Sequence, residues 1–120
     1  MRKKVIAKKI VAVDFDGTLS REKYPFIGKP NTELIEYLKA NRDKYILILH
    51  TMREGVQLEY AKKWLAEEQG LVFDYFNENV PYKIEQYGDK RKIYADIYVD
   101  DASKTSSEFV RGELDGKKRR

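Results

Sequence analysis

The sequence contains no cysteine and a single histidine, His50, which limits the metal chemistry available to it. Without cysteine the chain forms neither disulfides nor thiolate metal sites, and one histidine cannot build a histidine-rich site. A metal ion would therefore be held by carboxylate oxygens, which favours Mg²⁺ over zinc.

Long apolar runs are also missing. No segment approaches the length needed to cross a membrane, and the start, Met1-Arg2-Lys3-Lys4, lacks the hydrophobic segment of a secretion signal. With 37% charged and 42% apolar residues in 120, the composition is typical of one globular domain spanning 1–120. We expect a cytoplasmic protein without a membrane partner.

Charge of one sign is in modest excess, with a net value of +4. Much of the excess lies at the two ends, in 2–4, 8–9 and 117–120. Basic ends can contact nucleic acid or attract anionic substrates, but more often they are solvated tails. We interpret 112–120 as a flexible basic tail, and nucleic acid is a partner that we do not favour.

The most informative stretch is a β-branched apolar run, 10–13, that ends in Asp14, Asp16, Gly17 and Thr18. Such a run predicts a strand buried on both faces, from about Lys8 to Asp14. Both carboxylates then follow the strand's carboxyl end, where ligands bind in open α/β sheets. Alternate residues of an extended chain point the same way, so both acids are expected to face one substrate.

Helical and extended segments alternate along the rest of the chain. Asn31 is the expected N-cap of a helix ending near Arg42. Further strands are predicted over 45–50, 71–76 and 93–101, and further helices over 56–69, which Gly70 stops, and around 108–111. Between them, 19–30 predicts a loop or small flap beside the acids. The alternation indicates an α/β fold with a parallel sheet between helical layers.

Three of the predicted strands end in polar residues: the first in Asp14 and Asp16, the second in Thr51, the last in Asp100 and Asp101. Parallel strands bring their carboxyl ends to one edge, where the acids would repel each other without a cation. We expect Mg²⁺ held by Asp14 and Asp100, with Asp101 in support.

A phosphate group is the substrate moiety that suits such an edge. One carboxylate of the Asp14/Asp16 pair can attack phosphorus, and the other can move the proton of the leaving group. Thr51 can donate to a phosphate oxygen, and Arg53 can form a bidentate phosphate contact. A lysine would balance the charge. Lys92 precedes the last strand and is the expected one, with Lys83 and Lys90 as competitors.

These motifs resemble those of the haloacid-dehalogenase-like superfamily of aspartyl-phosphate phosphohydrolases. Asp14-Phe15-Asp16-Gly17-Thr18 matches its DxDGT signature, Thr51 the hydroxyl residue ending its second strand, Lys92 its third-motif lysine, and Asp100-Asp101 its terminal acidic pair. The resemblance covers about the first hundred residues, the size of a single domain, and implies a three-layer, Rossmann-like fold.

The chain is most similar to small phosphatases of that superfamily that lack a cap domain, as found in bacteria and phages. The likeness extends to 24–30, to Arg53 and to 92–101. It implies Asp14 as nucleophile, and Asp16 as general acid/base with its backbone carbonyl on Mg²⁺. It also implies Thr51 and Lys92 on phosphate, and Asp100 and Asp101 at the metal. Ile93 and Ala102 depart from the pattern, which affects contacts at the substrate end rather than catalysis.

The sequence thus predicts a Mg²⁺-dependent phosphomonoester hydrolase with an open site, acting on a phosphorylated small molecule or nucleotide, or on the phosphate of a macromolecule. A nucleic-acid end phosphatase, similar to the phosphatase half of polynucleotide repair enzymes, is the alternative that the basic ends weakly favour. A phosphoacceptor module without turnover ranks third. Signalling receiver domains carry their acid pair after the first strand, whereas this chain carries Asp100-Asp101 after the last.

Overall fold

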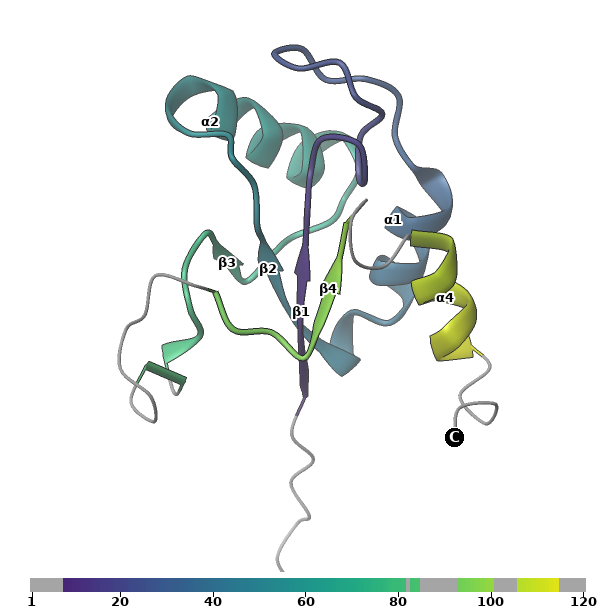
Figure 1. The fold of residues 1–120 in the computed structure, drawn as a ribbon. Coiled ribbons are helices and arrows are strands. Elements are labelled where there is room, and N and C mark those ends of the chain that lie inside the picture. Colours follow the sequence, from purple (N-terminus) through teal and green to yellow (C-terminus); the bar gives the residue numbers. More distant parts are fainter. Residues whose placement is uncertain (1–7, 82, 85–92, 101–105, 115–120) are drawn as a thin grey trace, which may run out of the picture.

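The computed structural model describes residues 8–81, 83–84, 93–100 and 106–114. Its centre is a parallel sheet of four strands in the order β3-β2-β1-β4 (Figure 1). The strands are β1 (Lys9–Val13), β2 (Tyr45–Leu49), β3 (Tyr75–Phe76) and β4 (Ile97–Val99). Within the described ranges no cap domain interrupts the connections between strands. The predicted α/β, Rossmann-like fold with a small parallel sheet and no cap is confirmed.

β1 lies between β2 and β4 and is buried on both faces, as its apolar sequence predicts. Val11 and Val13 pack into one apolar cluster, and Ile10 and Ala12 pack into a second cluster on the opposite face. The alternation follows from the period of two along an extended chain. Four of the five residues of β1 are buried, and this central strand holds the residue that follows it, Asp14, in place.

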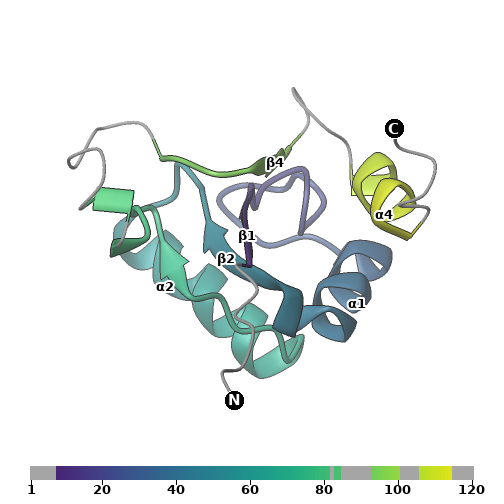
Figure 2. The same ribbon diagram turned by 90° about the horizontal axis from the view of Figure 1, so that it is seen from below.

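The helices α1 (Thr32–Ala40), α2 (Gly55–Lys63) and α4 (Ser106–Leu114) all contribute side chains to the cluster around Val11. α1 and α2 lie on the same side of the sheet, with α4 beside α1 (Figure 2). Asn31 caps α1 by accepting a hydrogen bond from the backbone N–H of Leu34, as predicted. Val80, Ile93 and Ala95 cover the other face of the sheet.

Several predicted boundaries differ from those of the structure. The helix expected over 56–69 is α2 followed by a π-helical segment, Trp64–Glu68, and Gly70 ends it with a φ of +69°. α4 runs to Leu114, so 112–114 are helical rather than part of the expected tail, because Phe109 and Val110 anchor this helix in the core. The remainder of that tail, 115–120, lies outside the described residues.

The two edge strands are shorter than predicted because an aspartate precedes each of them. The carboxylate of Asp74 accepts the N–H of Leu47 at 2.8 Å, and that of Asp96 accepts the N–H of Ile10 at 2.7 Å. The backbone N–H of Asp74 also donates to the carbonyl of Leu47, and that of Asp96 donates to the carbonyl of Ile10. These contacts replace the first rungs of regular strand pairing and fix both edge strands against the central pair. Within the described ranges, no helix is long and apolar enough to cross a membrane.

Candidate functional site

The candidate site lies where the strand order reverses, between β1 and β4. The chain passes from β1 outward to β2 and β3, and then crosses to the other side of β1 to form β4. In open α/β sheets ligands bind outside the carboxyl ends of the strands at such a switch point. Asp14 follows β1 and Asp100 follows β4, and the N–H of Asp14 still donates to the carbonyl of Val99 at 3.0 Å. The two acids therefore flank the switch point.

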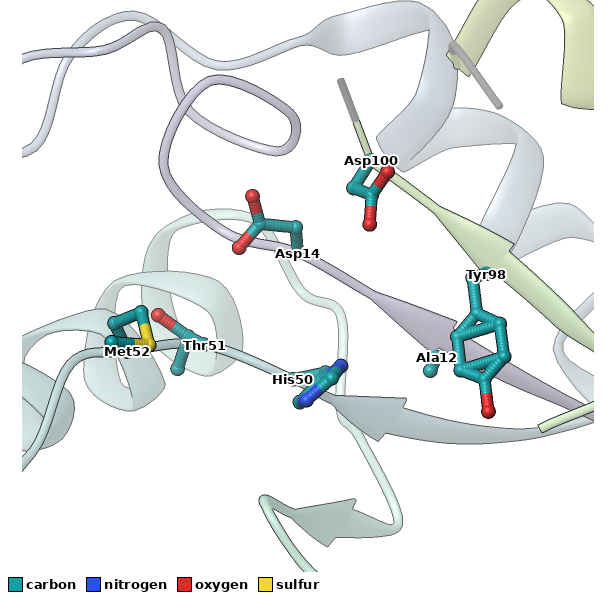
Figure 3. A pocket seen from close by; sticks show the side chains of 7 residues that line it. All are labelled: Ala12, Asp14, His50, Thr51, Met52, Tyr98 and Asp100. Carbon is teal, nitrogen blue, oxygen red and sulfur yellow. The ribbon is translucent and has the colours of Figure 1, made fainter. Parts of the chain in front are cut away.

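A pocket of about 200 Å³ opens at this edge of the sheet. Figure 3 shows the side chains of Asp14, Thr51 and Asp100 around it, each from the end of a different strand. The predicted meeting of these three residues at one edge is confirmed. The full lining comprises Ala12, Asp14, His50, Thr51, Met52, Tyr98 and Asp100.

Thr51 is fixed by hydrogen bonds on both sides. Its N–H donates to the side-chain oxygen of Asn77 at 2.8 Å, and its hydroxyl oxygen accepts the N–H of Arg53 at 3.1 Å. Because the hydroxyl accepts this bond, it keeps its own hydrogen for donation to an anionic oxygen in the pocket.

Asp16 does not line the pocket beside Asp14. A tight turn after Asp14, with Gly17 at a φ of +85°, carries its side chain to Arg53. The two carboxylate oxygens accept bonds from Nε and Nη2 of Arg53, both at 2.8 Å. The expectation that both carboxylates point the same way was wrong. It assumed that the extended conformation of β1 continues to Asp16, whereas the strand ends at Val13 and a turn follows.

Arg53 is buried, with 2% of its surface exposed, and it does not line the pocket. Besides Asp16, it donates to the backbone carbonyls of Pro25, Phe26 and Gln57 at 2.9–3.4 Å. Its guanidinium carbon also lies 4.9 Å from the ring centroid of Phe15 and 5.0 Å from that of Tyr24. The geometry does not bring Arg53 to the pocket as a phosphate ligand. It gives Arg53 the role of holding Asp16 and the 21–30 loop in place.

The two carboxylates at the pocket suit Mg²⁺, which needs few protein ligands. Mg²⁺ keeps several waters and takes one or two carboxylates together with phosphate oxygens, and Asp14 and Asp100 supply two carboxylates. Among the described residues no group of three or more histidine, cysteine or acidic side chains forms a ligand cluster. The expected third acid, Asp101, lies outside the described residues.

The expected phosphate-binding lysine, Lys92, and its competitor Lys90 also lie outside the described residues, as do most of the basic ends. Lys83, the other competitor, is described, and its ammonium lies 4.3 Å from the ring centroid of Tyr94. It does not line the pocket.

Sequence reasoning missed three residues that line the pocket. His50 is exposed at the pocket, and Met52 is 97% exposed there. Both flank Thr51 in the sequence, so their position at the same strand end could have indicated that they line the pocket. Tyr98 is half-buried in β4 and also borders the pocket.

Comparison with solved structures finds a conserved protein coded by a locus of Bacteroides thetaiotaomicron. The two chains are 33% identical, the match covers 93% of each, and the TM-score is 0.76. No protein-family model and no curated protein matches the chain.

Proposed function

The chain belongs to the same family as the conserved Bacteroides thetaiotaomicron protein, and we propose that it is a Mg²⁺-dependent phosphomonoester hydrolase of the haloacid-dehalogenase-like type. The observation that carries the proposal is the meeting of Asp14, Asp100 and Thr51 in one pocket at the switch point of the sheet.

Asp14 is the nucleophile of the proposal. One of its carboxylate oxygens forms a bond to phosphorus as the bond from phosphorus to the ester oxygen breaks, which leaves a phospho-aspartate. Water then forms a new bond to phosphorus, the bond to Asp14 breaks, and phosphate leaves. The end of a central strand suits this role, because the attacking oxygen must stay aligned with the breaking bond.

Asp16 moves the proton in both steps. It gives a proton to the departing ester oxygen, and later takes one from the attacking water. Both carboxylate oxygens of Asp16 are paired with Arg53 in this structure, so the proposal requires one oxygen to leave Arg53 and turn toward the pocket before it carries a proton.

Thr51 binds a phosphate oxygen through its hydroxyl, and Lys92 is proposed to neutralise a second oxygen. Asp14 and Asp100 would hold Mg²⁺, with Asp101 in support. Mg²⁺, when bound, offsets the charge of the phosphate so that a carboxylate can approach it.

A screen of phosphate esters with Mg²⁺ tests the proposal. We expect release of phosphate from small phosphomonoesters in the presence of Mg²⁺, with Asp14→Asn as the blank. Comparison with a 3′-phosphorylated oligonucleotide distinguishes a phosphatase of small molecules from a nucleic-acid end phosphatase, which would release phosphate from the oligonucleotide faster. No turnover of any ester, combined with stable phosphorylation of the protein, would instead indicate a phosphoacceptor module.

Replacement of Asp100 by asparagine is expected to raise the Mg²⁺ concentration for half-maximal activity by about tenfold or more, because a neutral amide is a weaker ligand for a hard cation. Titration of activity with Mg²⁺ after treatment with a chelator measures the shift. Asp43→Asn, an exposed acid outside the pocket, is the matched control and should keep the wild-type titration curve.

Replacement of Asp16 by asparagine is expected to slow the release of alkyl alcohols by about 10²–10⁴-fold, because the amide cannot give up a proton. The rate of the first step with p-nitrophenyl phosphate should fall much less, since nitrophenolate departs without protonation. A burst of nitrophenol followed by slow turnover would show that hydrolysis of the intermediate is impaired. Equal losses for alkyl and nitrophenyl esters, without a burst, would remove Asp16 from this role.

A further inference from the structure

His50 occupies the position next to Asp14 on the neighbouring strand. β1 and β2 pair as far as Val13 and Leu49, and the ladder continues one residue further, because the N–H of His50 donates to the carbonyl of Val13 at 2.9 Å. Neighbouring strands lie about 4.8 Å apart. His50 therefore flanks the proposed nucleophile on the side of β2, as Asp100 flanks it on the side of β4.

The side chain of His50 belongs to the same face of the sheet as that of Asp14. Two residues earlier, Ala12 and Ile48 pack together in the second apolar cluster. Side chains alternate between faces with a period of two, and the ladder still reaches Asp14 and His50. Both residues line the same pocket of about 200 Å³, as Figure 3 shows. Ala12 lines it too, and its methyl group leaves room beside the imidazole.

The imidazole of His50 is available to a ligand. It is exposed, and within the described ranges no hydrogen bond or ion pair engages it. A neutral imidazole carries one N–H donor, so it can bind an anionic oxygen without a change of protonation. Tyr98 also lines the pocket, but its hydroxyl donates to the carbonyl of Ile93. In the described lining, His50 and Thr51 are therefore the side chains with a hydrogen to donate.

The pocket has an acidic side and a donor side, separated by β1. A cation held by Asp14 and Asp100 would lie toward β4, whereas Thr51 and His50 both follow β2. A phosphate group at Asp14 has oxygens on both sides. Those toward β4 can bind the cation, and those toward β2 need hydrogen-bond donors, because an anionic oxygen left without a partner is costly.

We infer that His50 is a substrate-binding residue, whose imidazole N–H donates to a phosphate oxygen beside the hydroxyl of Thr51. The inference rests on the proposed phosphatase activity and adds a binding residue to it. A hydrogen bond to a charged oxygen contributes about a tenfold gain in affinity. The same contact holds the phosphate from the side of β2, so that phosphorus stays against the carboxylate of Asp14.

Three substitutions of His50 test the inference, with inorganic phosphate as a competitive inhibitor in the presence of Mg²⁺. His50→Phe keeps a planar ring but removes the donor, and we expect it to raise the inhibition constant of phosphate about tenfold. His50→Asn and His50→Gln carry amide donors at the reach of the two ring nitrogens, and one of them should retain most of the wild-type affinity. The melting temperature should stay unchanged in all three, because the imidazole is exposed.

Nuclear magnetic resonance provides a readout without turnover, because His50 is the single histidine of the chain and its imidazole signals need no further assignment. In Mg²⁺-loaded protein, inorganic phosphate should shift these signals in a saturable way, and calorimetry should show the same loss of phosphate binding in His50→Phe.

Absence of turnover with every ester would refute the phosphatase proposal, and the phosphate titration would still judge His50. Turnover with the same inhibition constant in wild type and His50→Phe, or imidazole signals that phosphate does not shift, would overturn the inference while leaving the activity intact. Equal weakening in the phenylalanine, asparagine and glutamine variants would show that the shape of the side chain matters rather than its donor, and would also overturn it.

Discussion

Asp14→Asn is expected to lower kcat for every phosphomonoester by at least about 10³-fold, because it removes the only oxygen that the proposal assigns to attack on phosphorus. Folding should survive. The side chain follows the last residue of β1 and projects into a pocket, so an amide of the same size fits the same space. Steady-state assays with p-nitrophenyl phosphate and circular dichroism of the same sample measure the two effects.

Asp43→Asn is the matched control for this substitution, since it makes the same chemical change at an exposed acid in the short helix Arg42–Lys44. It should keep wild-type activity. Substantial activity in Asp14→Asn with Mg²⁺ present would remove Asp14 as the nucleophile and would leave Asp100 or a water molecule as the attacking group.

Arg53→Met is expected to destabilise the fold by about 3 kcal/mol and to lower the melting temperature by about 10 °C. The substitution keeps an apolar stem between Phe15 and Tyr24, but it leaves Asp16 without its bidentate partner. The carbonyls of the 21–30 loop and of Gln57 lose their donor at the same time. Loss of a charge partner in a half-buried site costs far more than loss of an exposed pair. Thermal and urea denaturation give both values.

Arg42→Met offers a control of the same chemistry. Arg42 also pairs with an aspartate, Asp74 at 2.9 Å, and also donates to backbone carbonyls, but both partners are about one-third exposed. We expect a loss of about 1 kcal/mol and unchanged activity. If the two arginine variants lost equal stability, burial of the Arg53 pair would not be the reason for its effect. Arg53→Lys should recover only part of the stability lost in Arg53→Met, since an ammonium keeps the charge but cannot hold a carboxylate bidentately.

The strands and the edge that they share could be predicted from sequence because local patterns determine them. A buried strand such as β1 and an N-cap such as Asn31 are recognised from residues a few positions apart in the sequence. Parallel connections then force the strand ends together, which is why the meeting of Asp14, Thr51 and Asp100 followed from the order of elements alone. The lengths of the edge strands did not, because Asp74 and Asp96 act through contacts with residues 27 and 86 positions away.

The contacts of Arg53 could not be predicted from its position in the sequence. Sequence places it two residues after Thr51, which favoured a contact with substrate. Its actual partners come from the turn after β1, from the 21–30 loop and from α2. Only the folded arrangement of those three segments decides whether an arginine near a phosphate site faces the substrate or faces a neighbouring carboxylate.

The most direct measurement is the site of covalent phosphorylation during turnover. Asp16→Asn, in which hydrolysis of the intermediate is slow, is mixed with ³²P-labelled substrate and Mg²⁺, quenched in acid, digested and mapped. We predict an acid-stable, hydroxylamine-labile label on Asp14, and no label in the variant that also carries Asp14→Asn. Phosphate release without a label on Asp14, or a label on another residue, would contradict the account.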